Sequence, residues 1–471
     1  MVNYFFNGEE NMFVGREKEF EKLNHLYQSD HFEFAVFYGR RRVGKTTLIK
    51  EFLKGKTSFY YMAIEGTQAE NLAGLSKTIL SSNTEVSFST YEELFTHIDI
   101  LCSKERLILA IDEYPYLAAS YPAISSLLQS HIDNTWQNSR LFLILCGSSM
   151  SFMENQVLGY KSPLYGRRTA QFKLHPFTYF EAVQMLPDFP DEEKAILYGI
   201  TGGIPEYLKR IRPRVDLDTN ITELFFDESG RLFEEPTNLL KQELREPASY
   251  HSIISAIASG HSRINEIATK TGLESSGCSN QLTSLISLGI IRKEVPITEK
   301  ENSRKTLYSL CDTMFLFWYR FVRPNISAIS RGAGSEVYLH LVKPQLADFM
   351  GRIFEDICGQ YLFLPQIYTT LPFFIGNLGK WWGTNPHTKS QEELDLMAVF
   401  EEKALLCECK WRNASIEVAV VRKLLERGTL FPYQEKWYYL FSKTGFTKEA
   451  LEYGKANHVK MISFDEMNNR L

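Results

Sequence analysis

The sequence predicts an α/β fold with two separate sheets and a helical region between them. Three apolar runs, Phe34–Tyr38, Leu107–Ile111 and Leu141–Leu145, have the length and composition of buried parallel strands, and stretches of helical periodicity separate them. Strands and helices alternate again between about residues 393 and 463. A chain of 471 residues, 44% of them hydrophobic, is long and apolar enough for several domains with cores of their own.

The first apolar run leads into a glycine-rich loop, Gly39-Arg-Arg-Arg-Val-Gly-Lys-Thr-Thr47, and a segment of helical spacing follows. Strand, loop and helix in this order are the context of a nucleoside-triphosphate loop, in which backbone N–H groups and the helix N-terminus bind phosphates. We expect Lys45 to reach the terminal phosphates and Thr46 to hold Mg²⁺. The other predicted nucleotide-binding residues of the loop are Gly39, Arg42, Val43, Gly44 and Thr47. A basic loop at the start of a surface helix is the alternative, against which spacing and context argue.

Two carboxylates, Asp112 and Glu113, end the second apolar run. The carboxyl ends of parallel strands meet at the sheet edge where such folds bind ligands, so both side chains are expected near the phosphate loop. Asp112 would coordinate Mg²⁺, directly or through water, and Glu113 would polarise the water that attacks the γ-phosphate. The glutamate therefore predicts hydrolysis of the nucleotide rather than binding alone.

Five motifs occur in an order that is typical of one family. They are Phe13-Val-Gly-Arg-Glu17, the glycine-rich loop, Ile111-Asp-Glu-Tyr-Pro-Tyr116, Leu164-Tyr-Gly-Arg-Arg-Thr169 and Thr201-Gly-Gly-Ile-Pro-Glu-Tyr207. Together they resemble the archaeal-type P-loop ATPases of the STAND/MNS group, which are AAA+-like and also occur in bacteria. The resemblance extends to about residue 235 and implies an ATPase core of the additional-strand (ASCE) type, followed by a helical lid.

The resemblance also places the third apolar run, Leu141–Leu145, between the other two strands of the sheet. In such ATPases a polar residue at the end of this strand senses the γ-phosphate, and Ser148 is the best-placed candidate, with Ser149 next. The alternative is that these serines only cap the following helix.

Two further residues are assigned by the same resemblance. Arg167, chosen over its neighbour Arg168, would supply an arginine finger, in cis or from a neighbouring subunit, unless the pair is a solvated basic turn. Pro205 lies in a turn similar to the Gly-x-Pro segment by which the lid meets the nucleotide. A lid that carries this turn would open and close with the nucleotide state.

Residues 241–325 predict three short helices and a hairpin, the pattern of a winged helix. The helices are expected at 250–258, 264–270 and 275–288, and a returning strand at 306–310. The third helix has no arginine or lysine on its polar face, so base-specific readout is poorly supported. DNA contact is expected mainly from the wing residues Arg292, Lys293, Lys300, Arg304 and Lys305. A winged helix used for protein packing is the alternative. The aromatic run Met314–Phe321 is expected in a core or a domain interface rather than as a platform on which bases stack.

The C-terminal part carries a second set of charged residues. Asp395 lies at the start of a predicted strand, 393–400, where it should be exposed, and Glu408 and Lys410 share one face of the neighbouring strand because side chains alternate. Glu355 lies on a preceding helix. The set resembles the PD-(D/E)XK nucleases, which have a restriction-endonuclease-like α/β fold. The segment also resembles the domain of unknown function that often follows these ATPases.

The nuclease resemblance implies a role for each of the four residues. Asp395 and Glu408 would bind Mg²⁺ (or Mn²⁺), and Lys410 would orient the attacking water or stabilise developing charge. Glu355 would help to hold the metal or position Lys410. Asp395 lacks the preceding proline of the founding motif. A surface salt bridge between Glu408 and Lys410 on an edge strand is the alternative.

Composition limits the partners and the compartment. The net charge of −5 provides no global basic field, so binding to DNA must depend on local patches. No apolar run has membrane-spanning length, and Met1–Phe6 lacks the basic region and apolar core of a signal peptide. Seven scattered cysteines indicate reduced thiols. We expect a cytoplasmic protein that binds ATP and DNA, contacts no membrane and can form a homo-oligomer.

The sequence therefore predicts four regions: an ATPase core at 1–185, a helical lid at 186–240, a winged helix at 241–325 and a nuclease-like domain at 335–471. ATP binding or turnover would control Mg²⁺-dependent cleavage of DNA. One alternative is a STAND-like switch whose C-terminal domain only binds a partner. Another is a DNA-binding transcriptional regulator that uses ATP as a sensor.

Overall fold

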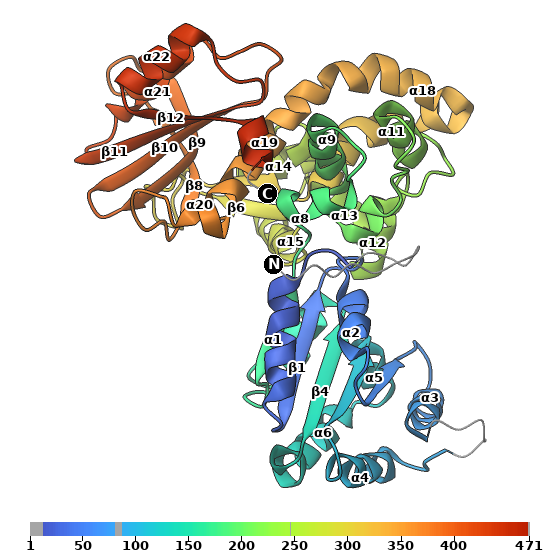
Figure 1. The fold of residues 1–471 in the computed structure, drawn as a ribbon. Coiled ribbons are helices and arrows are strands. Elements are labelled where there is room, and N and C mark those ends of the chain that lie inside the picture. The colour runs from blue at the N-terminus through green and yellow to red at the C-terminus, as the bar shows by residue number, and fades with distance from the viewer. Residues whose placement is uncertain (1–12, 81–86, 245, 470–471) are drawn as a thin grey trace. The chain divides into compact units, whose positions relative to one another are not determined.

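The computed structural model describes residues 13–80, 87–244 and 246–469, which form two compact units. Unit 1 extends to Phe177 and includes Ile204–Glu206, and unit 2 comprises Thr178–Gly203 and the described residues from Tyr207 onward (Figure 1). The segment Met1–Phe6, for which the sequence predicts no signal core, lies outside the described residues. Within the described ranges, every helix is too short or too polar to cross a bilayer.

Unit 1 contains a five-stranded sheet in the order β2-β3-β4-β1-β5, and all neighbouring strands are parallel. The strands are β1 (Glu33–Gly39), β2 (Ser58–Met62), β3 (Leu107–Asp112), β4 (Leu141–Gly147) and β5 (Ala170–Leu174). The position of β4 between β3 and β1 confirms the order that the resemblance implied. Every residue of β1, β3 and β4 is buried, as expected for parallel strands covered on both faces.

Helices connect the strands of unit 1 and cover the sheet (Figure 1). They are α1 (Glu17–Gln28), α2 (Lys45–Leu53), α3 (Gln68–Leu80), α4 (Tyr91–Cys102), α5 (Tyr114–Ser120), α6 (Ile124–Asn134) and α7 (Met150–Phe152). The apolar faces of α3 to α7 and residues of the strands share one core that includes Phe95 and Trp136, both fully buried. The glycine-rich loop, the two carboxylates and the serines all follow the carboxyl ends of parallel strands, which places them at the same edge of the sheet.

Unit 2 begins with α8 (Tyr179–Ala182), which lies in the range predicted for the ATPase core. The region predicted as a lid contains α9 (Asp191–Thr201), α11 (Leu217–Phe225) and the start of α12 (Glu235–Glu243). Three helices and an antiparallel hairpin follow: α13 (Pro247–Ala258), α14 (Ile264–Thr271), α15 (Ser275–Ser287), β6 (Ile291–Glu294) and β7 (Leu307–Leu310). The first of these helices starts earlier than predicted because Pro247 occupies its first turn, where a missing N–H is tolerated.

The aromatic run after β7 lies in the interior of unit 2. Phe315, Phe317, Trp318 and Phe321 are buried, and the Trp318 indole N–H donates to Phe233 O at 2.6 Å. The structure therefore confirms the prediction that this run belongs to a core.

The C-terminal part of unit 2 is a mixed sheet in the order β12-β11-β10-β9-β8. Its elements are α19 (Leu346–Leu362), β8 (Leu378–Thr384), β9 (Gln391–Phe400), β10 (Lys403–Lys410), α21 (Val418–Gly428), β11 (Glu435–Ser442), α22 (Lys448–Ala456) and β12 (Val459–Ser463). Strands β10, β11 and β12 are parallel, whereas β8 and β9 are antiparallel to their neighbours. The expectation that Asp395 is exposed is wrong, because α19 packs against β9 and β10 and leaves Asp395 only 8% exposed.

Candidate active sites

The glycine-rich loop has the backbone geometry of an anion-binding turn. Gly39 ends β1 with φ 146°, and a Cβ there would lie 2.4 Å from Leu174 O on β5, so only glycine fits. Gly44 precedes α2 with φ 91°, and Arg42 adopts φ 69°. Left-handed residues interspersed in such a loop turn successive N–H groups toward one side, where an anion can be bound. This requirement explains the glycine at position 44, which has open space around it.

Lys45 is held by the loop that it serves. Its Nζ donates to Gly39 O at 2.7 Å and to Arg40 O at 2.8 Å, and the residue is 6% exposed. Arg16, from the motif that precedes α1, donates through Nη2 to Val43 O at 3.0 Å. The same guanidinium lies 4.8 Å from the Phe177 ring centroid. Arg16, a buried arginine for which the sequence predicted no role, therefore supports the loop through its hydrogen bond to Val43.

The predicted Mg²⁺ residues meet each other directly. Thr46 Oγ1 donates to Asp112 Oδ2 at 2.6 Å, and the Glu113 N–H donates to Asp112 Oδ1 at 2.9 Å. A third donor is Tyr60 on β2, whose hydroxyl lies 2.8 Å from Asp112 Oδ2. Burial and the neighbouring Asp112 raise the pKa of the Tyr60 phenol, so it stays protonated. A hydroxyl and a carboxylate beside a phosphate-binding loop are the hard oxygen ligands that suit Mg²⁺ with a nucleotide.

Glu113 and Ser148 are joined by two hydrogen bonds. The Ser148 hydroxyl and its backbone N–H both donate to Glu113 Oε2, at 2.9 and 3.3 Å. Glu113 has φ 49°, an uncommon conformation for a residue other than glycine. Ser149 precedes α7 without a side-chain capping bond. Ser148 therefore contacts the predicted water-polarising carboxylate, and the capping alternative finds no support.

The remaining residues predicted for unit 1 lie in three places. Arg167 is tied to Asp133 by two hydrogen bonds of 2.6 and 2.7 Å and also donates to Pro163 O. Among the described residues, the Arg168 guanidinium makes no hydrogen bond or ion pair. Thr47 is exposed on the first turn of α2. Pro205 begins the short helix α10 (Pro205–Leu208) after two glycines with positive φ.

Asp395, Glu408 and Lys410 form one buried cluster on β9 and β10. Lys410 Nζ lies 2.6 Å from Glu408 Oε1 and 3.5 Å from Asp395 Oδ2. Asp395 Oδ2 also accepts the Cys409 N–H at 2.7 Å. Burial lowers the pKa of Lys410, but the two carboxylates outweigh burial and raise it above its usual value. The pair is therefore no exposed edge-strand salt bridge, since Glu408 is only 6% exposed and β10 is an inner strand.

Glu355 on α19 lies beside this cluster and is paired with Lys380 on β8. Burial raises the pKa of the Glu355 carboxyl to about 7, with a further contribution from Asp395, although Lys380 opposes the shift. The structure thus places all four predicted residues close enough to interact electrostatically, and it adds Lys380 to the group.

Arg427 on α21 is a second cation that the sequence did not assign. Its Nη1 lies 2.6 Å from Glu408 Oε2 and its Nε 2.9 Å from Glu392 Oε2. Within the described ranges, no group of three or more His, Cys, Asp or Glu side chains is placed to hold a metal ion. Asp395 and Glu408 are hard donors of the type that Mg²⁺ uses, and further ligands would have to come from water or the backbone.

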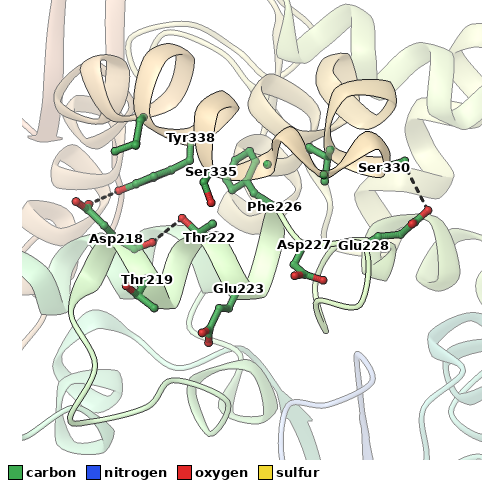
Figure 2. A pocket seen from close by; sticks show the side chains of 14 residues that line it. Asp218, Thr219, Thr222, Glu223, Phe226, Asp227, Glu228, Ser330, Ser335 and Tyr338 are labelled. Atoms are coloured by element: carbon green, nitrogen blue, oxygen red, sulfur yellow. Dashed lines mark hydrogen bonds between the residues drawn. The ribbon is translucent and has the colours of Figure 1, made fainter.

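Unit 2 also contains a cavity of about 580 Å³ between α11 and the helical segments of residues 329–339. Figure 2 shows Asp218, Glu223, Asp227 and Glu228 on its wall, with Asp218 accepting from the Tyr338 hydroxyl. Four carboxylates would repel a phosphate group. We therefore do not assign this cavity as a nucleotide site, despite its volume.

Comparisons with known proteins place both candidate sites in recognised regions. Residues 13–211 match a family model described as an ATPase domain predominantly from Archaea. Residues 318–422, which include Glu355, Asp395, Glu408 and Lys410, match a model described as archaeal and bacterial proteins of unknown function.

Several known proteins resemble this chain. An uncharacterized protein of Methanocaldococcus jannaschii is 33% identical over 446 residues, which cover 93% of this chain and 97% of the relative. An uncharacterized ATP-binding protein of the same organism is 49% identical over 45 residues, 10% of this chain and 76% of that one. The Walker-type ATPase of Pyrococcus abyssi has a similar fold, with a TM-score of 0.50 and 21% identity over 65% of this chain and 96% of that one. The chain is a member of the family of P-loop ATPases whose ATPase domain is found predominantly in Archaea.

Proposed function

We propose that this chain couples the nucleotide state of its ATPase site to metal-dependent cleavage of DNA by its C-terminal part. The observation that carries the nuclease part is the buried cluster of Asp395, Glu408 and Lys410 on two neighbouring strands. Surface ion pairs are ordinary, but buried carboxylates that share one lysine are costly, and perturbed charges of this kind cluster at functional sites.

In the ATPase site, the chain supplies positioning and charge. The N–H groups of the loop and the Lys45 ammonium would bind the phosphates, and Thr46 and Asp112 would hold Mg²⁺, which would supply positive charge beside the phosphates. Glu113 accepts a proton from the attacking water, and Ser148 keeps Glu113 oriented through its two hydrogen bonds. We assign the arginine finger to Arg168 rather than Arg167, because Arg167 is committed to Asp133.

In the C-terminal site, Asp395 and Glu408 would hold a divalent cation, which polarises the phosphodiester and lowers the pKa of its bound water. Lys410 is charged and is placed against both carboxylates, so it can orient a water molecule or stabilise the negative charge of the transition state. Glu355, which interacts with Asp395 electrostatically and is paired with Lys380, would help to hold the metal.

Contacts within unit 2 support coupling between the hairpin and this site. The Ile297 N–H, in the loop of the hairpin, donates to Lys380 O at 2.9 Å. Arg292 on β6 lies 3.0 Å from Asp356, the neighbour of Glu355. The exposed cations of the hairpin, Lys293, Lys300 and Arg304, are available for DNA phosphates. A DNA contact on the hairpin would thus be transmitted to Lys380 and Asp356, which are the partner and the sequence neighbour of Glu355.

The test is a cleavage assay with supercoiled and linear DNA, with Mg²⁺ or Mn²⁺ and ATP. Wild-type protein is expected to cut, a chelator to stop the cut, and Asp395→Asn to fall to background while ATP hydrolysis continues. Cleavage that survives in Asp395→Asn would come from another source and would refute the proposal.

The raised pKa of Glu355 predicts that cleavage depends on pH. The groups that face Glu355 are Lys380, Asp395 and Asp356. With a pKa of about 7, the ionised fraction of Glu355 increases about tenfold between pH 6 and pH 8, and the cleavage rate should rise with it. Glu355→Gln is expected to flatten the profile. Because the folded state holds this proton more tightly than the unfolded state, wild-type stability should also fall, relative to Glu355→Gln, as the pH rises through 7. Identical profiles for the two proteins would contradict the assignment.

A STAND-like switch with a silent C-terminal domain is the second candidate. It is favoured by the side-chain cations on the cluster, since Lys380 contacts Glu355 and both Lys410 and Arg427 contact Glu408. These cations compensate the carboxylates without a metal. Oligomerisation that depends on ATP, with full function in Lys410→Ala, would favour the switch.

A further inference from the structure

We propose that Tyr60 is a positioning residue of the ATPase site, which fixes Asp112 in the orientation that binds Mg²⁺. Tyr60 lies on β2, an edge strand to which no motif assigns a function. Strand β2 pairs in parallel with β3, so that Tyr60 is opposite Ala110 and Met62 is opposite Asp112. Because side chains alternate along a strand, Tyr60 and Met62 lie on the same face of β2, and Met62 is the residue opposite Asp112. The tyrosine side chain is long enough to span the two residues between them and reach the Asp112 carboxylate.

The two carboxylates at the end of β3 are held from opposite sides. Asp112 is reached by Tyr60 from β2, and Glu113 is reached by Ser148 after β4, the strand on the other side of β3. The hydrogen bonds from Tyr60 and Ser148 act on different carboxylates. Tyr60 acts on the predicted metal ligand, whereas Ser148 acts on the predicted acceptor of the water proton.

Asp112 needs this support because it is 1% exposed. A buried carboxylate has lost water and depends on protein donors. Oδ1 accepts from the Glu113 N–H, and Oδ2 accepts from Thr46 and Tyr60. Without the Tyr60 hydroxyl, Oδ2 would lose one of its donors, and Thr46, which also donates to it, is itself a predicted Mg²⁺ ligand. Tyr60 thus holds the carboxylate without being a ligand.

The Tyr60 ring is itself fixed from α2. Lys50 Nζ lies 5.0 Å from the ring centroid, close enough for a cation–π contact. Lys50 follows Thr46 by one helical turn, so the ring bridges the helix of the phosphate loop and the strand of the carboxylate. Removal of the Tyr60 hydroxyl should therefore alter the relative positions of the Thr46 hydroxyl and the Asp112 carboxylate.

The test compares Tyr60→Phe with Tyr61→Phe. Tyr61 is the next residue of the same strand, and its hydroxyl donates to Asn71 Oδ1 at 2.9 Å, away from Asp112. Both variants lose one hydrogen bond of a tyrosine hydroxyl, partly buried at Tyr60 and buried at Tyr61, so Tyr61→Phe controls for loss of stability. Each is titrated with Mg²⁺ in the presence of a fluorescent, non-hydrolysable ATP analogue, and the ATPase rate is measured at the same Mg²⁺ concentrations.

Loss of a residue that orients a metal ligand typically costs about 10- to 100-fold in metal affinity. Tyr60→Phe is therefore expected to raise the half-saturating Mg²⁺ concentration by at least about tenfold in the binding assay, with the ATPase rate largely restored at high Mg²⁺. Tyr61→Phe should match wild type. The proposal is overturned if Tyr60→Phe shows the wild-type Mg²⁺ midpoint, if high Mg²⁺ fails to restore its rate, or if Tyr61→Phe shifts equally.

Discussion

Glu113→Gln is expected to lower kcat for ATP hydrolysis by about 10²- to 10⁴-fold and to leave ATP binding intact. The amide keeps the size of the carboxylate and can still accept from Ser148, but it cannot take a proton from water. The φ of 49° at position 113 is available to glutamine as to glutamate, so the backbone has no reason to change. Single-turnover hydrolysis and equilibrium binding of an ATP analogue measure the two quantities separately.

The control for this prediction is Glu92→Gln, an exposed glutamate in the first turn of α4. It removes the same charge from the same unit without touching the site. A Glu113→Gln variant that hydrolyses ATP at the rate of Glu92→Gln would show that Glu113 is not the proton acceptor.

Lys410→Ala is expected to lower the rate of DNA cleavage by about 10²-fold or more, because it removes a preorganised cation from the reacting centre. The fold should survive, since Glu408 keeps Arg427 at 2.6 Å and Asp395 keeps the Cys409 N–H. Because Asp395 loses the cation beside it, the unfolding temperature is expected to fall, whereas ATP hydrolysis, which depends on other residues, should be close to wild type. The measurement is the initial cleavage rate with saturating Mn²⁺.

Lys403→Ala provides the matched control for Lys410→Ala. Lys403 begins the same strand, and its closest carboxylate is Glu435 at 3.9 Å. Both variants remove one lysine from β10, but only one of them changes the cluster. Equal cleavage rates for the two variants would leave Lys410 without a role in catalysis.

The central strands of unit 1 could be predicted because parallel strands that are buried on both faces read as continuous apolar runs. The runs that contain Phe34, Leu109 and Leu143 correspond to β1, β3 and β4 with boundaries close to those observed. The phosphate loop and the two carboxylates follow from their places after these strands. Their contacts with each other, such as Thr46 to Asp112, agree with that reasoning.

The residues that sequence reasoning missed lie on elements with weak patterns. Tyr60 is on β2, an edge strand whose aromatic residues belong to no motif, so nothing in the sequence links Tyr60 to Asp112. Lys380 is on β8, the edge strand of the second sheet. Arg427 is 19 residues from Glu408 in sequence and meets it only because α21 packs against β10. Arg16 is the exception: it stands inside a recognised motif, and its buried bond to Val43 could have been suspected from that position.

The prediction for Asp395 shows why burial is hard to infer from one strand. Alternation of side chains predicts that Leu394 and Leu396 lie on the buried face of the strand and Asp395 on the other face, toward solvent. The structure covers that face with α19, so both faces of β9 are buried. A neighbouring helix is a tertiary feature that the periodicity of a strand does not contain.

The most direct test of the account is the rate of DNA cleavage with ATP, with ADP and without nucleotide, at constant Mn²⁺, for wild type and for Lys45→Ala. Lys45 is part of the phosphate loop and belongs to unit 1, so its loss should affect the C-terminal site only through nucleotide binding. If the two units are coupled, wild-type rates should differ between nucleotide states by at least about fivefold, and Lys45→Ala should cut at one rate in all three. Equal rates for wild type in all three conditions would contradict the coupling of ATP to cleavage.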